Sequence, residues 1–592
     1  MELMSTDRSV ESPPETPLSG DDGFAAALAA RDVPFLFNLP GTQTLSLLRK
    51  MAENPGGPRA IFIRHEQAAA YGAVGYAKVT GRPAVCLAVP GPGATNMLTG
   101  VASAQADGIP LVVATPQVPS ELLGRGVLHD ADLGALFAPT VKGVVEVVAP
   151  EDLGPGLARA IDLSLTPRQG PVQLLFPSSF LVTRIDGFEL PDVPEGVAQP
   201  ATTDLDAARA LLQTARRPII WAGDRVHFAG ARAALRELAE VLGAPVVTDE
   251  MARGVFPENH PLAMGTASFR AMPEVLAEAD VCVAVGTAFP EWSTVSWTMP
   301  VPQSLVHLND EPGVFNLNYP AAVGVSGDLA ASLAHLVTAL AGRAAPGDDW
   351  GSARVTRARE SGLAAIAADR ADYVDAGRGM HPGDVVSALR AALPADVLVC
   401  TDGSATGNWL SEESFPVLAS SGMLQSDVFK ETGSALCAGM GAKLAAPERE
   451  VVVVQGDGGL LFQLGELASL CHNEIKLIVV VFDDGFFNAD RIYQEYVFGG
   501  RESDCALFNP DFAAVATAFG LHGENVTSVA ELGASLRDAL KRNSSTVIAA
   551  KIDPMALPYR LRSRIEVWKK RTAAAQAAST DSGRNGARVT AS

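Results

Sequence analysis

The sequence is poor in cysteine and in aromatic residues. Its 592 residues include six cysteines, and Phe, Trp and Tyr together make up 6% of the chain. The cysteines are scattered, with no Cys-x-x-Cys pair and no histidine at metal-ligand spacing: Cys86, Cys282, Cys400, Cys437, Cys471 and Cys505. Because disulfide frameworks and zinc sites need clustered cysteines, this pattern argues against both and favours reduced thiols in a cytoplasmic protein.

Long apolar runs and excess positive charge are also missing. Nowhere do about 18 apolar residues follow one another, which argues against a helix that spans a membrane. The 46 Lys and Arg against 67 Asp and Glu give a net charge of −21, which argues against nucleic acid or an anionic membrane as a partner. The start of the chain lacks the apolar centre of a signal peptide. We expect residues 1–21 and 571–592 to be disordered from their composition.

Short β-branched segments alternate with helical patterns along the chain, and hydrophobic residues make up 47% of it. This order is typical of parallel sheets covered by helices. Stretches rich in Pro, Gly, Ala and acidic residues near 191–204 and 342–350 read as linkers. The sequence therefore predicts an α/β protein with three domains of parallel sheets flanked by helices, at 22–190, 205–342 and 375–560.

Turn residues and functional candidates stand where the predicted strands end. The predicted strands are Pro34–Asn38, Ala60–Arg64, Ala84–Ala88 and Pro110–Ala114 in the first domain, Pro218–Ala222, Pro245–Thr248, Val281–Val285 and Ser304–Leu308 in the second, and Val397–Thr401, Glu450–Gln455, Lys476–Phe482 and Thr546–Ile552 in the third. Ligands on open parallel sheets gather at the carboxyl ends of strands. These strand exits are therefore the places to look for a site.

In the third domain, a strand of four valines and Gln455 leads into Gly456-Asp457-Gly458-Gly459 and a predicted helix. A glycine turn before a helix presents backbone N–H groups to a phosphate, and Asp457 is a hard oxygen ligand for Mg²⁺. The next strand ends in Asp483-Asp484, which brings a second carboxylate to the same edge. Taken alone, this block leaves open an ordinary turn beside a solvated aspartate pair.

In the first domain, a predicted strand leads into His65-Glu66-Gln67 and a helix of small residues. A carboxylate at a helix start often does no more than satisfy free N–H groups, so an ordinary helix-capping charge is the alternative for Glu66. The following strand ends in a rigid loop before another helix, Pro90-Gly91-Pro92-Gly93-Ala94-Thr95-Asn96. Small helix residues permit close packing on a partner element.

Together these motifs resemble the thiamine-diphosphate-dependent enzymes that include acetolactate synthase and benzoylformate decarboxylase, over about residues 22–553. The resemblance implies pyrimidine-binding, central Rossmann-like and diphosphate-binding domains, in that order. It implies that Glu66 hydrogen-bonds the aminopyrimidine ring and so promotes proton removal from the thiazolium carbon. It also implies a site between the first domain of one subunit and the third domain of another, in a homodimer or homotetramer.

The resemblance further assigns ligands and substrate contacts. Mg²⁺ would be held by Asp457, Asp484 and the backbone of Phe486, and thiamine diphosphate by Gly456, Gly458, Gly459, Ser404, Ala405, Thr432 and Gly433. Gly41, Thr42 and Lys142 correspond to substrate positions, and Gln117 and His129 to catalytic positions. For His129 a surface-loop histidine is an equal alternative.

Several runs depart from the family's pattern. Asp483-Asp484 replaces an Asn-Asn pair, and Asn488 stands where the family has glycine. Thr432, within Lys430-Glu431-Thr432-Gly433, falls where a large apolar side chain bends the cofactor. The run Gly286–Trp292 lacks the arginines associated with flavin binding in acetolactate synthases, so we do not expect FAD.

Three functions follow from this reading. The first is a carboligase that decarboxylates a small 2-oxo acid, with pyruvate as the first candidate, and transfers the acyl carbanion to a carbonyl acceptor. The second is a simple 2-oxo-acid decarboxylase, and the third is a catalytically degenerate scaffold or regulatory subunit. The segments Asn488–Arg501 and Tyr559–Arg571 are candidates for lids over the site, with plain surface packing as the alternative.

Overall fold

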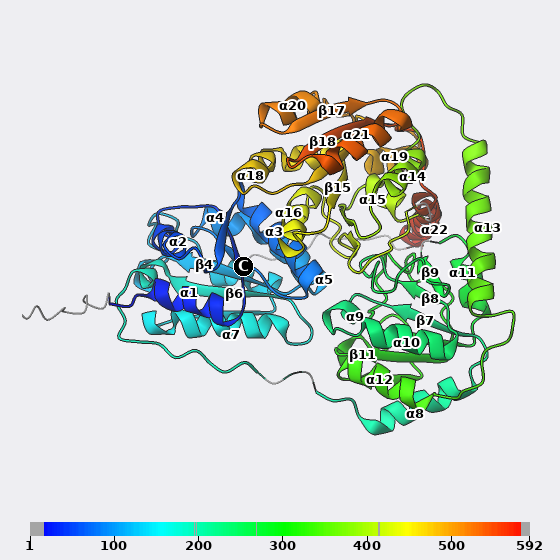
Figure 1. The fold of residues 1–592 in the computed structure, drawn as a ribbon, viewed down its shortest axis with the longest axis horizontal. Coiled ribbons are helices and arrows are strands. Elements are labelled where there is room, and N and C mark those ends of the chain that lie inside the picture. Colours follow the sequence, from blue (N-terminus) through cyan, green and yellow to red (C-terminus); the bar gives the residue numbers. More distant parts are fainter. Residues whose placement is uncertain (1–16, 195, 197, 268, 413–414, 582–592) are drawn as a thin grey trace, which may run out of the picture.

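The computed structural model describes residues 17–194, 196, 198–267, 269–412 and 415–581. Three six-stranded sheets follow one another along the chain, and every strand pair in them is parallel. Helices cover the sheets, and Figure 1 shows the three domains as blue to cyan, green, and yellow to orange parts of the ribbon. The predicted fold class is confirmed. The exact limits of the domains stay a prediction.

The first sheet has the order β2-β1-β3-β4-β6-β5. Its strands are β1 (Phe35–Asn38), β2 (Arg59–Phe62), β3 (Val85–Leu87), β4 (Leu111–Gln117), β5 (Gly143–Glu146) and β6 (Pro171–Pro177). Its helices are α1 (Gly20–Ala30), α2 (Leu45–Ala52), α3 (Glu66–Thr80), α4 (Pro92–Asn96), α5 (Leu98–Asp107), α6 (Leu133–Phe137) and α7 (Leu153–Leu165). Prediction located the first four strands but missed β5 and β6.

The second sheet has the order β12-β11-β10-β7-β8-β9. Its strands are β7 (Pro218–Ala222), β8 (Val246–Thr248), β9 (Ala263–Thr266), β10 (Val281–Val285), β11 (Leu305–Asn309) and β12 (Val323–Ser326). Its helices are α8 (Thr202–Thr214), α9 (Arg225–Phe228), α10 (Arg232–Leu242), α11 (Met272–Glu278) and α12 (Leu329–Ala339). The long helix α13 (Ser352–Ala371) then leads toward the third domain along the edge of the molecule (Figure 1).

The third sheet has the order β14-β13-β15-β16-β18-β17. Its strands are β13 (Leu398–Cys400), β14 (Met423–Leu424), β15 (Val451–Gly456), β16 (Ile478–Asp483), β17 (His522–Val526) and β18 (Thr546–Lys551). Its helices are α14 (Pro382–Ala392), α15 (Ala405–Leu410), α16 (Ala435–Ala445), α17 (Asp457–Phe462), α18 (Leu467–His472), α19 (Asn488–Tyr496), α20 (Phe512–Ala518), α21 (Val529–Lys541) and α22 (Tyr559–Asp581). Strands β15 and β16 are adjacent at its centre, so their carboxyl ends share one edge.

The first and third domains pack together through α3 and α16, which lie side by side at the centre of Figure 1. The contact depends on glycine, since a Cβ added at Gly441 would overlap the carbonyl of Gly72 and one at Gly75 would overlap the carbonyl of Ala438. A single hydrophobic core runs through both domains, from Phe37 of the first to Val479 of the third. Small side chains therefore allow two helix backbones to approach closely.

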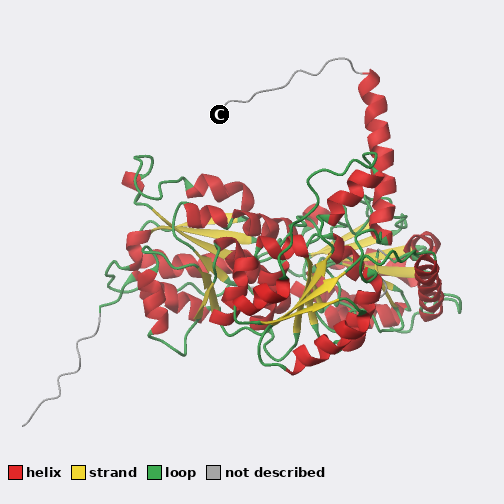
Figure 2. Cartoon of the chain, turned by 90° about the horizontal axis from the view of Figure 1, so that it is seen from above, coloured by secondary structure: helices red, strands yellow, loops and turns green. Residues whose placement is uncertain are grey.

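The ends of the chain are more ordered than expected where they are described. Residue Ser19 bridges to Arg184, and α1 begins at Gly20, so the expected disorder of 1–21 is wrong for its last residues. Helix α22 continues to Asp581 because five alanines favour helix between residues 573 and 578, which corrects the expected disorder from 571. Figure 2 shows this helix extending away from the body. Residues 1–16 and 582–592 lie outside the described part.

The two segments expected as lids or as surface packing are mainly helical. Most of 488–501 and of 559–571 forms α19 and α22, which pack on one another through Ile492, Leu561 and Ile565. Their role as lids stays a prediction. No helix among the described residues is long and apolar enough to cross a membrane.

Candidate active site

The predicted phosphate turn lies between β15 and α17. Four buried valines hold β15 in the sheet, and α17 begins at Asp457 directly after Gly456. A Cβ added at Gly458 would lie 2.5 Å from the ring of Phe487, and one added at Gly459 would lie 2.5 Å from Oδ2 of Asp402. Only glycine fits at these two positions. The turn therefore exposes backbone rather than side chains, as a diphosphate cradle requires.

A buried carboxylate that the sequence reasoning overlooked organises the opposite wall of this cradle. Asp402 follows β13, and its Oδ2 accepts a hydrogen bond of 2.8 Å from the backbone N–H of Gly433. Burial raises the pKa of Asp402 above its usual value. Gly433 has a φ of +89°, where a side chain would be strained and would also meet Cβ of Phe462. The Asp-Gly pair at a strand exit was the signal available in the sequence.

Asp457 and Asp484 come together at the shared edge of β15 and β16. Oδ1 of Asp457 accepts from the N–H of Gly458 at 2.8 Å, and Oδ2 accepts from the N–H of Gly485 at 2.7 Å. Burial and the charge of Asp457 raise the pKa of Asp484 to about 7, and burial also raises the pKa of Asp457. Two buried carboxylates that repel each other in this way are stabilised by a cation placed between them.

The residues around this pair explain two of the departures from the family's pattern. Asn509 donates to Oδ2 of Asp457 at 2.6 Å and to Oδ1 of Asp483 at 2.8 Å, while Lys551 lies 3.5 Å from Asp483. The extra negative charge of Asp483 is thereby offset. Asn488 donates to Oδ2 of Asp484 at 2.8 Å and is the first residue of α19. The side chain that replaces the family's glycine therefore positions the carboxylate of Asp484.

The donor set suits Mg²⁺ better than a transition metal. Within the described part of the chain, no group of three or more His, Cys, Asp or Glu side chains is placed to hold a metal. The candidates are two carboxylates with amide and backbone oxygens nearby, which is the chemistry that Mg²⁺ prefers. The Oδ1 atom of Asn509 and the side-chain amide of Gln455 are buried beside the turn without a hydrogen-bond partner among the described residues. Such unpaired polar atoms are expected where a polar ligand completes a site.

In the first domain, Glu66 is the first residue of α3 and is buried. Its Oε2 accepts a hydrogen bond of 2.9 Å from Nδ2 of Asn96, the last residue of α4. A Cβ added at Gly93 would lie 3.1 Å from Oε1, so the glycine of the Pro-Gly-Pro-Gly loop leaves space beside the carboxylate. The two motifs that sequence analysis singled out in this domain therefore meet at one sheet edge.

The predicted substrate loop lies at the same edge. Nδ1 of His129 is 3.2 Å from the side-chain amide of Gln43, which also accepts from the hydroxyl of Thr42 at 3.0 Å. Gly91 packs against the backbone of His129, and a Cβ added at Gly41 would overlap Val89. His129 thus belongs to the loop cluster around Thr42 and Gly91. Gln43, which joins them, was not among the predicted residues.

Two predicted residues have other neighbours. Gln117 ends β4 at the carboxyl edge of the first sheet, accepts from the N–H of Val118 at 3.3 Å and lines a cavity of about 460 Å³, so its catalytic role stays a prediction. Lys142 precedes β5 and so lies at the amino edge of the sheet, where it donates to Thr166. Burial and the nearby guanidinium of Arg225 lower the pKa of Lys142 to about 8. The geometry of a single chain does not bring Lys142 to Glu66.

The two halves of the candidate site are not joined within one chain. The hydrogen bonds of Glu66 and of Asp457 among the described residues each stay within their own domain. The same chain's third domain instead reaches the loop just before Glu66, where Glu466 accepts from the N–H groups of Arg64 and His65 at 3.0 and 2.8 Å. Within one chain, the third domain therefore contacts the backbone before Glu66, while the carboxylate of Glu66 is hydrogen-bonded inside the first domain.

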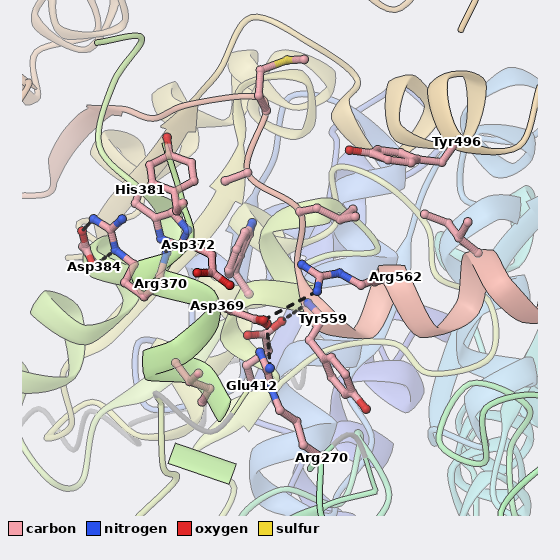
Figure 3. Close-up of a pocket in the computed structure, with 18 of the residues that line it drawn as sticks. Arg270, Asp369, Arg370, Asp372, His381, Asp384, Glu412, Tyr496, Tyr559 and Arg562 are labelled. Carbon is pink, nitrogen blue, oxygen red and sulfur yellow. Dashed lines mark hydrogen bonds and ion pairs between the residues drawn. The ribbon is translucent and has the colours of Figure 1, made fainter. Parts of the chain in front are cut away.

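Another cavity has none of the predicted site residues in its wall. It measures about 610 Å³ between α13, α14, α15 and α22. Figure 3 shows Arg270 and Arg562 both directed at Asp369, at 2.7 and 3.7 Å. Arg370 pairs with Asp384 at 2.5 Å. Arg270 and Arg562 thus share one carboxylate, and Arg370 has its own.

The run Gly286–Trp292 follows β10 in the second domain. The hydroxyl of Thr287 donates to Asp249 at 2.6 Å, and the ring of Phe289 packs edge-on against Trp221. These contacts occupy part of the strand exit, and a cavity of about 70 Å³ remains beside Gly286, Ala288 and Pro290. The expectation that no FAD binds there stays a prediction.

Comparison with known proteins places all three domains. The chain matches the models of the thiamine pyrophosphate enzyme family for the N-terminal TPP-binding domain at residues 18–136, the central domain at 205–336 and the C-terminal TPP-binding domain at 402–550. Thiamine pyrophosphate is another name for thiamine diphosphate. The matched order is the order of the three sheets.

Curated relatives are similar over nearly their whole length. The chain is 31% identical to the acetolactate synthase large subunit of Parasynechococcus marenigrum, covering 90% of this chain and 87% of the relative. It is 33% identical to the "Probable 2-ketoarginine decarboxylase AruI" of Pseudomonas aeruginosa, covering 90% and 94%. Identity to the acetolactate synthase isozyme 2 large subunit of Escherichia coli is 28%, covering 91% and 96%. With three domain models matched in order and relatives similar end to end, the chain belongs to the thiamine pyrophosphate enzyme family, as an acetolactate-synthase-like member.

Proposed function

We propose that this enzyme is a carboligase that removes CO₂ from a small 2-oxo acid, with pyruvate as the first candidate, and joins the remaining acyl group to a second carbonyl compound. The observation that carries the proposal is the cradle around Asp457, where two repelling carboxylates and a glycine turn meet at one strand edge. The acetolactate synthase large subunits among its relatives support the reaction class.

The residues of the cradle fit both parts of the cofactor's charged end. Asp457 and Asp484, with the backbone carbonyl of Phe486, would hold Mg²⁺, which would supply positive charge to the diphosphate site. The backbone at Gly458 and Gly459 would contact the diphosphate, with Ser404, Ala405 and Gly433 on the opposite wall. When bound, thiamine diphosphate supplies the electron sink for loss of CO₂.

Glu66 would act on the pyrimidine end of the cofactor. Oε2 of its carboxylate accepts a hydrogen bond of 2.9 Å from Asn96. This bond fixes the orientation of the carboxylate, which would share a proton with the ring. Because no hydrogen bond joins Glu66 to the third domain of its own chain among the described residues, we place the complete site between two copies. His129 and Thr42 would then lie on the substrate side of the first domain.

The proposed function is tested by CO₂ release from a panel of 2-oxo acids, with and without thiamine diphosphate and Mg²⁺, and by analysis of products with added aldehyde or 2-oxo acid acceptors. We expect cofactor-dependent release and a ligated product. Changing Glu66→Gln should lower kcat by about 10²- to 10⁴-fold, the usual contribution of a positioned acid or base. The exposed control Glu151→Gln should behave like the wild type. An unchanged rate for Glu66→Gln would contradict the assigned role.

A second candidate function is decarboxylation without ligation, which the similarity to the 2-ketoarginine decarboxylase favours. The same panel separates the two, because an aldehyde product that persists in the presence of every acceptor identifies a decarboxylase. No cofactor binding by calorimetry and no CO₂ release from any acid would instead identify a scaffold without activity.

A further inference from the structure

Two of the departures from the family's pattern meet in one cavity beside the cofactor cradle. A cavity of about 180 Å³ is lined by Asp402 and Ser404 of the cradle, by Trp292 of the second domain and by Lys430 of the loop that precedes Thr432. The two runs are far apart in sequence. Helices α19 and α22 also contribute to the wall, through Tyr493 and Leu561.

Lys430 presents a cation to this cavity. Its Nζ lies 4.7 Å from the centre of the Trp292 ring, and this cation–π contact offsets part of the burial that lowers the pKa of Lys430. The backbone is fixed by a hydrogen bond of 2.9 Å from the N–H of Lys430 to Ser426. Among the described residues, no carboxylate oxygen lies within 4.0 Å of Nζ, and Asp427 acts on it only at longer range. The ammonium group is therefore free to contact a ligand.

The other cations at Trp292 are already paired. Arg560 and Arg564 lie 5.0 and 3.9 Å from the ring centre. Arg560 forms an ion pair with the buried Glu250, and Arg564 pairs with Glu291 at 2.8 Å. Their charges are compensated and their positions fixed. Lys430 differs from both because its charge faces the cavity without a direct counter-ion.

The chemistry of decarboxylation decides which anion suits this cation. A positive group against the carboxylate that leaves as CO₂ stabilises the reactant more than the transition state, because that charge is lost from the carboxylate as the bond breaks. A cation here would slow the reaction if it bound that group. It would assist binding without this penalty if it contacted an anionic group that the reaction retains.

We propose that Lys430 is a specificity-determining residue that binds a substrate carboxylate which the reaction keeps. The inference rests on the proposed function. Such a carboxylate has two sources, either a 2-oxo acid that serves as the acceptor or a donor with a second, distal carboxylate. The cavity of about 180 Å³ is smaller than pockets for drug-sized ligands, which measure about 300–1,000 Å³, so it suits a small acid.

Direct binding provides the first test. The holoenzyme with thiamine diphosphate and Mg²⁺ is titrated calorimetrically with propionate and with propionamide, which has the same shape without the charge. We expect propionate to bind more tightly. Lys430→Met, which keeps the apolar stem over Trp292, should weaken propionate binding by roughly 10- to 100-fold and leave propionamide unchanged. Lys430→Arg should retain the preference for propionate, and the exposed Lys541→Met should match the wild type.

Turnover then separates the two sources. In the donor arm, CO₂ release from 2-oxoglutarate and from pyruvate is compared without an acceptor. In the acceptor arm, ligation from one fixed donor to a 2-oxo acid is compared with ligation to a neutral aldehyde. Lys430→Met should reduce kcat/KM by at least about tenfold only in the arm whose carboxylate contacts Lys430.

The outcomes that overturn the inference differ from those that overturn the proposed function. Equal binding of propionate and propionamide, or a Lys430→Met variant that keeps every preference of the wild type, rejects the role of Lys430 while CO₂ release continues. Absence of cofactor binding and of CO₂ release in the wild type rejects the proposed function itself. Retained cofactor binding by Lys430→Met shows that a lost preference is not a loss of the fold.

Discussion

At the residue scale, the site depends on two buried carboxylates that repel each other until a cation is bound. The raised pKa of Asp484, about 7, has burial and Asp457 as its causes. Asp484→Asn removes one metal ligand together with the repulsion. We expect Mg²⁺-dependent binding of thiamine diphosphate, measured by calorimetry, to weaken by at least about tenfold, because a charged oxygen ligand becomes neutral. The protein without cofactor should unfold at the same temperature as the wild type or higher.

The exposed Asp504→Asn serves as the control, since it changes the same charge on the surface near the site. Equal cofactor affinity in Asp484→Asn and the wild type would remove Asp484 from the ligand set.

Among single residues, motifs along the chain predicted Glu66, Asp457 and Asp484 as site candidates. Gln43 and Asn509 were missed because their importance comes from contacts with distant segments, which leave no local spacing in the sequence. Asp402 had a local signal, the Asp-Gly pair at a strand exit, and was overlooked.

At the scale of elements, the closest contact between domains is the crossing of α3 and α16. Gly441→Ala would place a Cβ against the backbone carbonyl of Gly72, which cannot move like a flexible side chain. We expect a loss of about 1–3 kcal/mol, the usual cost of overpacking, seen as a lower midpoint of thermal unfolding. Gly465→Ala is the matched control, because a Cβ there meets open space. Equal midpoints for the two variants would mean that the helices separate without cost.

Elements were predictable where the local pattern was strong. Most interior strands are buried apolar runs, such as β15, and were located to within a few residues. The exception is β6, which lies between β4 and β5 and was missed. The missed strands are short or contain polar residues, as β17 does with its partly exposed His522–Val526, so they are stabilised mainly by pairing with β18. The helical end of the chain at α22 was missed because composition alone was taken to indicate disorder.

At the scale of the whole molecule, the proposed site needs two copies of the chain, one giving Glu66 and the other giving Asp457. This arrangement predicts complementation between inactive variants. When Glu66→Gln and Asp457→Asn chains are dissociated and mixed in equal amounts, half of the dimers are mixed, and each has one intact site and one doubly altered site. We therefore expect CO₂ release to recover to about a quarter of the wild-type rate in a random mixture.

Two tags on the parent chains allow the mixed dimer to be isolated, and it should show about half of the wild-type rate per dimer. Mixing Glu66→Gln with Glu66→Ala should give no recovery, since every site then lacks the same group. Failure of the first pair to recover, in dimers shown to be mixed, would mean that both halves of each site come from one chain, and that α3 must move relative to the third domain before Glu66 can reach the cofactor.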